Sequence, residues 1–330
     1  MNDLGQWLTR LAPDSVVRTG DRAAHFGDVL TEAAIIDSQT TKTPLGECGV
    51  VGIGGPEAAE FLHAQLSAEC LTLADGDSRL TAWCTPKGRV LYLLRLVCHG
   101  ASYLALLPRD QAGDFVKRLS LFVLRAKVEI SDLSASQGVI VVNQGPDQTC
   151  IEALREAEDA VCAASDARGQ CWVVGGFETL IEAWPGIPGT PVGENAAALA
   201  DIRLGQPRLM QALAEAFLPQ ELNLDALGGL SFEKGCYPGQ EIVARVKFRG
   251  AVKRRLSRLI SAGNATPEPG TRIVSSPAGK PVGTVLFSAK SAANAFELLG
   301  VLDLAAGAIA LDGDTETDLN RETLPYSVAS

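Results

Sequence analysis

The chain has 330 residues and a formal net charge of −10, with 46% hydrophobic and 21% charged residues. A chain of this length can bury a large core and is long for one domain, so two or three modules are expected. It contains no long apolar run and starts without a basic region followed by an apolar stretch. These features predict neither a membrane span nor a secretory signal, and cytoplasmic localisation is expected.

Cysteine and histidine are too scattered to suggest a metal site. The eight cysteines include no Cys-x-x-Cys pair, and the chain has only three histidines. Local motifs for zinc or for a cysteine-ligated cluster are therefore missing, and no bound metal is expected. The expected state is reduced thiols that fill the core.

The N-terminal part predicts two strands and a helix. Strands are expected at residues 33–38 and 49–54, and a helix is expected from Pro56 onward. Gln65 lies near the apolar stripe of that helix. Its side chain either caps a neighbouring loop or contacts a ligand.

A strand meander is expected next, at residues 80–84, 89–98 and 102–107. Its first turn carries Lys87 and Arg89. These two charges are either solvated at the tip of a hairpin or hold an anion.

Helices and strands then alternate without a regular period, which favours an α+β fold over a doubly wound sheet. Helices are expected at 110–124 and 148–160, and Asn195 is expected to cap an Ala-rich helix that leads to Gly205. Buried strands are expected at 128–130, 139–142 and 171–174. The end of the chain predicts a small all-β barrel, with strands at 255–260, 271–274, 282–287, 296–302 and 308–311.

The octapeptide Lys234-Gly-Cys-Tyr-Pro-Gly-Gln-Glu241 concentrates reactive side chains in one short stretch. Its glycines and proline predict a turn that another group can approach closely. If the stretch is extended, Lys234 and Cys236 share a face, and the ammonium favours the thiolate. The alternative is a tight turn with a buried, inert cysteine.

This octapeptide, with Asn223 before it and Ala244-Arg245, Arg249-Gly250 and Lys253-Arg254 after it, resembles the signature of the YgfZ family. That family comprises folate-binding, tRNA-modification and iron–sulfur proteins, and it is related to the T-protein, the aminomethyltransferase of glycine cleavage. The likeness extends over nearly the whole chain. It implies a T-protein-like fold, with two interleaved α/β lobes around a central cavity in residues 1–247 and a small β-barrel in residues 248–330.

The resemblance also implies a function. It points to a protein that binds tetrahydrofolate or a derivative and supports the maturation or repair of iron–sulfur enzymes, including those that thiolate tRNA. Iron–sulfur client proteins are the expected partners, and direct contact with tRNA is left open. Cys236 would be the key thiol, with Lys234 beside it. The expected ligand-binding residues are Gln65, Lys87, Arg89, Asn223, Tyr237, Gln240, Glu241, Arg245 and Arg249. Where well-known bacterial members carry two tryptophans, this chain has Cys48 and Ala197, which implies weaker folate binding or a different pose.

Residues 245–258 contain seven basic residues and no acidic one, inside an acidic protein. In an extended segment Arg245, Lys247 and Arg249 would line one face, with Val246 and Phe248 packed inward. The run is either a charged strand edge or an anion funnel for a folate tail or for RNA phosphates.

Two other functions remain as alternatives. One is a folate-dependent aminomethyltransferase, which needs a carboxylate near the reactive nitrogen of the cofactor. The T-protein hairpin carries an acidic pair where this chain has Lys87 and Arg89, and this favours a non-enzymatic role. The other is a thiol redox or persulfide carrier that acts through Cys236, with Tyr237 and Gln240 as hydrogen-bond donors to the thiolate.

Overall fold

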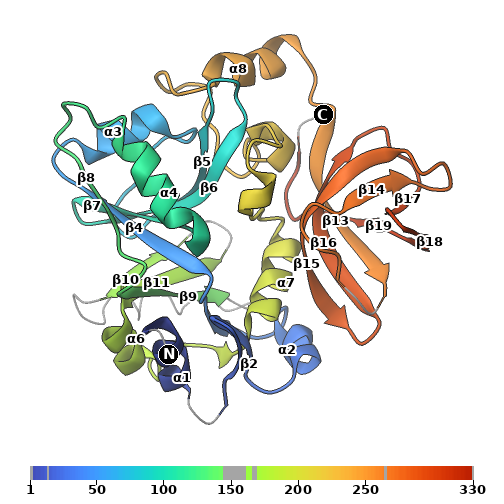
Figure 1. The fold of residues 1–330 in the computed structure, drawn as a ribbon, viewed down its shortest axis with the longest axis horizontal. Coiled ribbons are helices and arrows are strands. Elements are labelled where there is room, and N and C mark those ends of the chain that lie inside the picture. Colours follow the sequence, from blue (N-terminus) through green and yellow to red (C-terminus); the bar gives the residue numbers. More distant parts are fainter. Residues whose placement is uncertain (1–2, 13–14, 144–160, 166–168, 264–265, 329–330) are drawn as a thin grey trace. The chain divides into compact units, whose positions relative to one another are not determined.

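The computed structural model describes residues 3–12, 15–143, 161–165, 169–263 and 266–328 (Figure 1). The chain forms two compact units, and each is assembled from separate stretches of sequence. The first unit comprises Met1–Leu62, Cys70–Arg79 and Leu94–Ala197. The second unit comprises His63–Glu69, Leu80–Leu93 and Ala198–Ser330.

The first unit is a mixed α/β structure. Its helices are α1 (Asp3–Leu11), α2 (Val29–Ile35), α3 (Ala58–Gln65), α4 (Arg109–Ser120), α6 (Phe177–Ala183) and α7 (Glu194–Leu204). Helices α3 and α7 begin in the first unit and end in the second. Strands β1 (Val17–Thr19) and β2 (Arg22–His25) form a two-stranded antiparallel ribbon.

The apolar runs of the sequence form two five-stranded sheets. One has the order β10-β11-β9-β3-β12 and consists of β3 (Thr41–Pro44), β9 (Gln137–Asn143), β10 (Val161–Ser165), β11 (Gln170–Gly176) and β12 (Thr190–Pro191). The other has the order β5-β6-β7-β4-β8 and consists of β4 (Cys48–Gly54), β5 (Ser78–Cys84), β6 (Val90–His99), β7 (Ser102–Pro108) and β8 (Glu129–Asp132). The hairpin between β5 and β6 belongs to the second unit.

Helix α1 shows how this unit packs its core. Its apolar residues recur every three or four positions and are buried. Trp7 stacks on Phe177 of α6, with ring centroids 5.2 Å apart. A Cβ atom at Gly138 of β9 would lie 2.7 Å from the Trp7 ring. Glycine at this position therefore lets the helix approach the sheet.

The second unit combines short helices with a large C-terminal sheet. Its helical segments are η1 (Gln211–Leu213), η2 (Pro219–Leu222) and α8 (Gln240–Arg249). The sheet has the order β18-β17-β14-β15-β16-β13-β19. Its strands are β13 (Arg254–Ala262), β14 (Arg272–Ser275), β15 (Pro281–Ala292), β16 (Ala295–Asp303), β17 (Ile309–Leu311), β18 (Asp314–Asp318) and β19 (Asn320–Glu322). Figure 1 shows this sheet, coloured orange to red, curled like half of a barrel.

The predicted fold class is confirmed, because the described chain has mixed helices and sheets and a curled C-terminal sheet. The meander and the five predicted C-terminal strands are present, and β18 and β19 were not foreseen. The expected helix at 148–160 lies outside the described residues. The predicted domain boundary at residue 247 stays a prediction.

Four local predictions are wrong. The strand expected to be buried at 128–130 is β8, whose residues are exposed or half-buried. Residues 33–38 are not a strand but the end of α2 and the turn after it. Helix α2 begins after Asp28 because the Asp28 carboxylate accepts from the backbone N–H groups of Leu30 and Thr31. Asn195 does not cap α7, since the helix already begins at Glu194. The basic residues 245–249 are not extended but form the second half of α8.

Candidate functional site

The octapeptide forms a bend and a turn and then becomes the first residues of α8. Lys234 and Cys236 are not in a strand, so the expected shared face does not form. Gly239 has φ of 83° and precedes the helix. A Cβ atom there would lie 2.5 Å from the carbonyl oxygen of Thr85 and 2.6 Å from Cα of Gly88. Only glycine fits, and its absence of a side chain brings the hairpin tip against the turn.

Lys234 anchors this segment to the end of α3. Its side chain is buried, and its Nζ donates to the carbonyl oxygens of His63, Leu66 and Ala68, the last two at 2.7 and 2.9 Å. The last carbonyl groups of a helix have no partner within the helix, and a cation near them is favourable. The ammonium group that was expected to activate the thiol is therefore bound by three carbonyl groups.

Cys236 is exposed, whereas Cys48 is half-buried and Cys70, Cys84, Cys98 and Cys171 are buried. Cys84, in the same unit, shows the contrast. Complete burial raises the pKa of the Cys84 thiol to about 12, so that cysteine is inert at neutral pH. Cys236 is thus the described cysteine that a partner molecule can reach.

Tyr237 fixes the segment on the other side of Cys236. Its ring is buried, and Nζ of Lys234 lies 5.3 Å from the ring centroid. Burial, with a smaller contribution from Cys84, raises the pKa of Tyr237 far above its usual value. With Lys234 and Tyr237 both packed inward, the intervening thiol is held on a fixed loop and points to solvent.

The cations of the hairpin differ from each other. Lys87 is exposed and forms no ion pair among the described residues. Arg89 donates to the carbonyl oxygen of Ala216 at 3.0 Å and to the Glu221 carboxylate at 3.3 Å. Arg89 therefore stabilises the loop above η2, and Lys87 is the hairpin cation that remains available to an anion.

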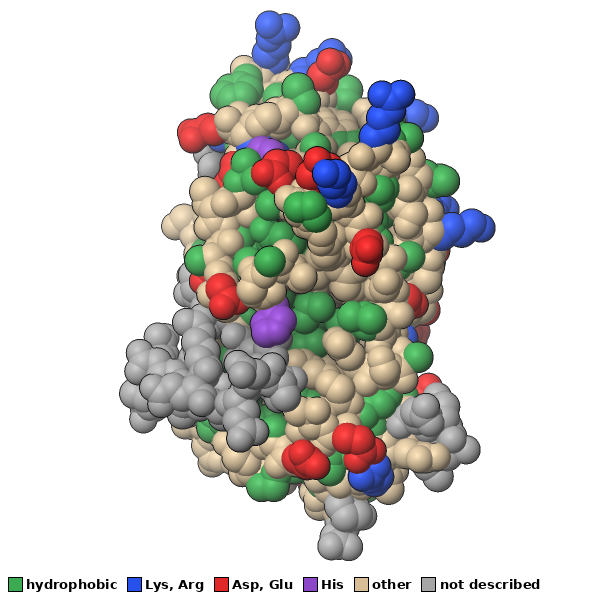
Figure 2. Space-filling model, turned by 90° about the vertical axis from the view of Figure 1, so that its left-hand side faces the viewer, with side chains coloured by type: hydrophobic (Ala, Val, Ile, Leu, Met, Phe, Trp, Pro, Cys, Tyr) green, Lys and Arg blue, Asp and Glu red, His purple; other side chains and the backbone are tan. Residues whose placement is uncertain are grey.

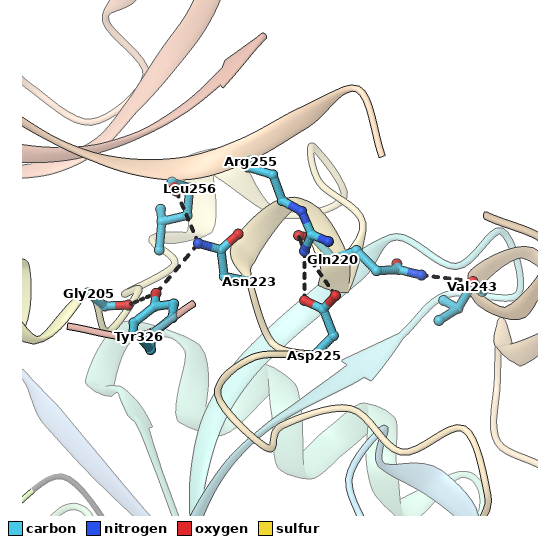
Figure 3. Close-up of polar contacts among 8 residues, drawn as sticks. All are labelled: Gly205, Gln220, Asn223, Asp225, Val243, Arg255, Leu256 and Tyr326. Atoms are coloured by element: carbon cyan, nitrogen blue, oxygen red, sulfur yellow. Dashed lines mark hydrogen bonds and ion pairs between the residues drawn. The ribbon is translucent and has the colours of Figure 1, made fainter. Parts of the chain in front are cut away.

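Asn223 ends η2 in the left-handed region, with φ of 56°. Its Nδ2 donates to the carbonyl oxygen of Leu256 at 3.0 Å and lies 3.5 Å from the hydroxyl of Tyr326, which in turn donates to the carbonyl oxygen of Gly205 at 2.7 Å (Figure 3). Residues 205, 223 and 326, which are far apart in the sequence, are thus joined by consecutive hydrogen bonds. These hydrogen bonds attach the C-terminal residues around Tyr326 to the end of η2.

The basic run from 245 to 258 divides into two groups. Arg254 pairs with Glu221 at 2.8 Å, Arg255 with Asp225 at 2.7 Å, and Arg258 with Glu297 at 2.8 Å. Figure 3 shows Arg255 reaching Asp225 while its guanidinium also donates to the carbonyl oxygen of Gln220. The second group, Arg245, Lys247, Arg249 and Lys253, is exposed and has no ion-pair partner among the described residues. We call these four residues the outer cations.

The outer cations lie on α8 and on the residues that follow it. Arg245 and Arg249 are one helical turn apart and so share a face of α8, together with Glu241. Figure 2 shows one face of the molecule, with Lys and Arg side chains near the top of the view and Asp and Glu side chains among them. Gln240, the first residue of α8, is half-buried, and Glu241 is exposed.

A cavity of about 630 Å³ opens in the second unit, and sequence reasoning missed it. It lies between the loop at 225–233, the end of α8 and the following linker. Its lining includes Gln220, Asp225, Leu230, Phe232, Lys247 and Arg255. None of the expected ligand-binding residues lines it. The loop at 225–233 carries no motif that would have identified it.

Several expected ligand-binding residues carry a buried polar atom without a partner in the described part of the chain. These atoms are Oε1 of Gln65, Oδ1 of Asn223 and the hydroxyl of Tyr237. A buried polar group without a partner costs about 1–3 kcal/mol, so such groups normally bind water or a ligand. Gln65 and Asn223 offer acceptor oxygens and Tyr237 offers a hydroxyl that donates or accepts, which are the kinds of group that pair with the ring edge of a pterin.

No group of three or more His, Cys, Asp or Glu side chains within the described residues is placed to hold a metal ion. No described helix has both the length and the apolar character that crossing a membrane requires.

The chain was then compared with known proteins. No family model matches it. It is 30% identical over 256 residues to the tRNA-modifying protein YgfZ of Cronobacter sakazakii, and the match covers 71% of this chain and 75% of the relative. It is 30% identical over 303 residues to the protein of the same name from Edwardsiella ictaluri, with 84% of this chain and 89% of the relative covered.

Among solved structures, the glycine cleavage system aminomethyltransferase T from Bartonella henselae aligns with a TM-score of 0.70 and 14% sequence identity. The alignment covers 98% of this chain and 97% of that one. This likeness confirms the predicted T-protein-like fold.

Proposed function

Because the chain belongs to the family of YgfZ tRNA-modifying proteins, we propose that it supports the modification of tRNA through the exposed thiol of Cys236. In the finer form of the proposal, the protein binds a tetrahydrofolate-type molecule and serves iron–sulfur enzymes that thiolate tRNA. Its role is accessory rather than that of an enzyme with its own turnover.

The observation that carries this proposal is the presentation of Cys236. The thiol is exposed, while the residues on either side are held by the buried Lys234 and Tyr237 side chains. A cysteine that only fills space would be buried, as Cys84 is. A thiol fixed in orientation and open to solvent suits contact with a partner protein or its cluster.

The carrier version of the thiol proposal has less support. A redox cysteine works with a resolving thiol whose thiolate is accessible. Cys84 lies near Tyr237, since its charge contributes to the raised pKa of that phenol, but Cys84 is itself buried and protonated. We therefore favour transient contact with a client over an internal disulfide cycle.

For the folate part of the proposal, Gln65, Asn223 and Tyr237 would hold the polar edge of the pterin with their unpartnered atoms. Lys87, exposed on the hairpin that packs against the Gly239 turn, would bind a carboxylate of the glutamate tail. A bound tetrahydrofolate derivative would supply a one-carbon group or a redox-active pterin. Arg89 is not assigned to the tail, because Glu221 already neutralises it.

The thiol proposal is tested in cells that lack the native gene. Cells that express Cys236→Ser should lose thiolated tRNA nucleosides, measured by mass spectrometry of digested tRNA, and should lose activity of iron–sulfur enzymes. Cys84→Ala serves as the matched control and should retain both. Normal levels of thiolated nucleosides with Cys236→Ser would overturn every version in which this thiol acts.

The folate proposal is tested by calorimetric titration with 5-formyltetrahydrofolate. Tyr237→Phe keeps the buried ring and removes the unpartnered hydroxyl, so it should leave the free protein as stable as before or slightly more stable. The same change should weaken folate binding at least fivefold if the ligand bonds to this hydroxyl. Equal binding by Tyr237→Phe would remove Tyr237 from the site, and the absence of saturable binding to the native protein would refute the folate proposal.

A further inference from the structure

The outer cations form a positive surface that the fold itself does not use. Arg254, Arg255 and Arg258 form ion pairs with carboxylates, two of which, Glu221 and Glu297, are shared with Arg89 and Arg203. Arg245, Lys247, Arg249 and Lys253 form no ion pair within the described residues. No acidic residue occurs in the sequence between Glu241 and Glu268. In a protein with a net charge of −10, this local positive potential needs an anionic partner to explain it.

An exposed aromatic residue lies among these charges. Phe248 is 68% exposed, although its ring is large and apolar. It meets Phe232 edge-on, with centroids 6.1 Å apart, and Nζ of Lys247 lies 3.8 Å from the centroid of Phe232. The two rings are thus held in place, and one of them offers a face to solvent. Cations around an accessible aromatic face are the features with which proteins bind unpaired nucleic acid.

The cavity of about 630 Å³ adjoins this surface, because Phe232, Val246 and Lys247 all line it. Its size is within the range of small-molecule sites. Its lining carries the carboxylates of Glu69, Asp225 and Glu233 and the cations Lys247 and Arg255, and Asp225 pairs with Arg255. The interior therefore has no excess positive charge to hold a phosphate. A neutral base would be accepted, because carboxylates accept hydrogen bonds from its amino and imino groups.

We propose that the outer cations, Phe248 and the adjoining cavity bind an unpaired segment of RNA. The phosphates contact the outer cations, one base stacks on Phe248, and a neighbouring base enters the cavity beside Phe232. This inference rests on the proposed function for its choice of RNA, and it goes beyond that function by naming the surface and the form of RNA that is bound. Duplex RNA would present phosphates without accessible base faces and would bind more weakly.

An acidic protein is the other partner that a positive surface can attract. Such a partner would need the charges alone and would leave the exposed Phe248 and the cavity unused. RNA engages all three features at once, because phosphates alternate with stackable bases along one strand.

The test is fluorescence anisotropy with a labelled, unstructured RNA oligonucleotide and the purified full-length protein. Each phosphate contact on a single strand contributes about 0.7 to the slope of log affinity against log salt. The double variant Arg245→Gln, Arg249→Gln should therefore reduce that slope by about 1.4 and lower affinity about 25-fold at about 0.1 M salt. The control is Lys117→Gln, Arg125→Gln, which removes the same charge from exposed residues of the first unit and should bind as the native protein does.

The aromatic part is tested separately. Phe248→Ala should weaken binding of the oligonucleotide about tenfold. An abasic oligonucleotide of equal length keeps the phosphates, so it should bind the native protein and Phe248→Ala equally. If Lys117→Gln, Arg125→Gln weakened RNA binding as much as Arg245→Gln, Arg249→Gln, the effect would come from net charge alone. That result would overturn the proposal. Equal affinity for duplex and unpaired RNA, or binding only to acidic proteins, would overturn it as well.

These outcomes are independent of the thiol test. Cys236→Ser should bind the oligonucleotide normally while it fails to support tRNA thiolation in cells. If native protein binds no RNA but Cys236→Ser still abolishes thiolation, the proposed function stands and the RNA surface falls.

Discussion

The loop before α8 and the outer face of α8 carry the same kinds of side chain and use them in opposite ways. In the loop, Lys234 is buried against three carbonyl oxygens and Tyr237 is buried beside it. On α8, Arg245 and Arg249 are exposed and unpaired among the described residues. Cys84 and Cys236 repeat the contrast, because one thiol is buried and the other exposed.

The comparison separates residues that hold the fold from residues that are available to a partner. A buried cation needs hydrogen-bond acceptors or a counter-charge, which Lys234 finds in three carbonyl oxygens and Arg255 in Asp225. Both residues are therefore structural requirements of the second unit. An exposed charge far from an opposite charge contributes little to stability. Exposed charges that gather on one helix therefore reflect function rather than folding.

The largest expected effect on stability comes from the buried cation Lys234. Lys234→Met keeps the length of the side chain and removes the ammonium group, leaving the carbonyl groups of Leu66 and Ala68 without their donor. We expect a loss of about 3 kcal/mol in the free energy of unfolding. Urea denaturation followed by circular dichroism measures it. Lys253→Met, an exposed lysine of the same unit, is the control and should change stability by no more than about 0.5 kcal/mol. A similar loss of stability in Lys234→Met and Lys253→Met would contradict the distinction between the buried cation and the outer cations.

An intermediate effect on stability is expected at alkaline pH from the buried thiol of Cys84. The pKa of Cys84 is raised from 9.0 to about 12 in the folded protein, so above pH 9 the unfolded chain releases this proton and the folded protein keeps it. Stability is therefore fully present below pH 9 and falls as pH rises, by about 1.4 kcal/mol per pH unit from this group.

Urea denaturation at pH 8 and pH 10 checks this sign. The native protein should lose about 1.4 kcal/mol more than Cys84→Ala over this interval. An identical pH dependence in the two proteins would show that Cys84 is ionisable in the fold and that the inner thiol resembles the outer one.

The sequence predicted the parts of this arrangement that depend on local pattern. The C-terminal strands follow from alternating apolar residues between Gly and Pro turns, and the octapeptide was singled out by its composition. The tight turn at Gly239 was also foreseen. Its packing against Gly88 explains why glycine occurs in both turns.

What the sequence did not predict depends on contacts between distant residues. Lys234 was expected beside the thiol, because its carbonyl partners lie at residues 63–68, far away in the chain. The sequence alone does not divide the seven basic residues into two groups. The division depends on Glu221, Asp225 and Glu297, which pair with Arg254, Arg255 and Arg258 and are distant in the chain.

The conformation of residues 245–249 was misjudged for a related reason. The alternation of basic and apolar residues matches a strand, and Phe248 was expected to pack inward. The same residues also fit a helix in which Val243 is buried and Phe248 is exposed, and the turn at Gly239 starts that helix. Two periods were compatible with the sequence, and the tertiary contact of the turn decided between them.

The smallest expected effect on stability is the most informative about function. Arg245→Ala, Arg249→Ala removes two charges from α8, where Arg249 lies in the last turn and interacts favourably with the helix dipole, while alanine is the better helix former. These contributions oppose each other, so the free energy of unfolding should change by less than about 1 kcal/mol. A larger loss would mean that the outer cations have partners within the fold and serve stability as Lys234 does. If stability is unchanged while RNA affinity falls, the same two residues are assigned to a partner.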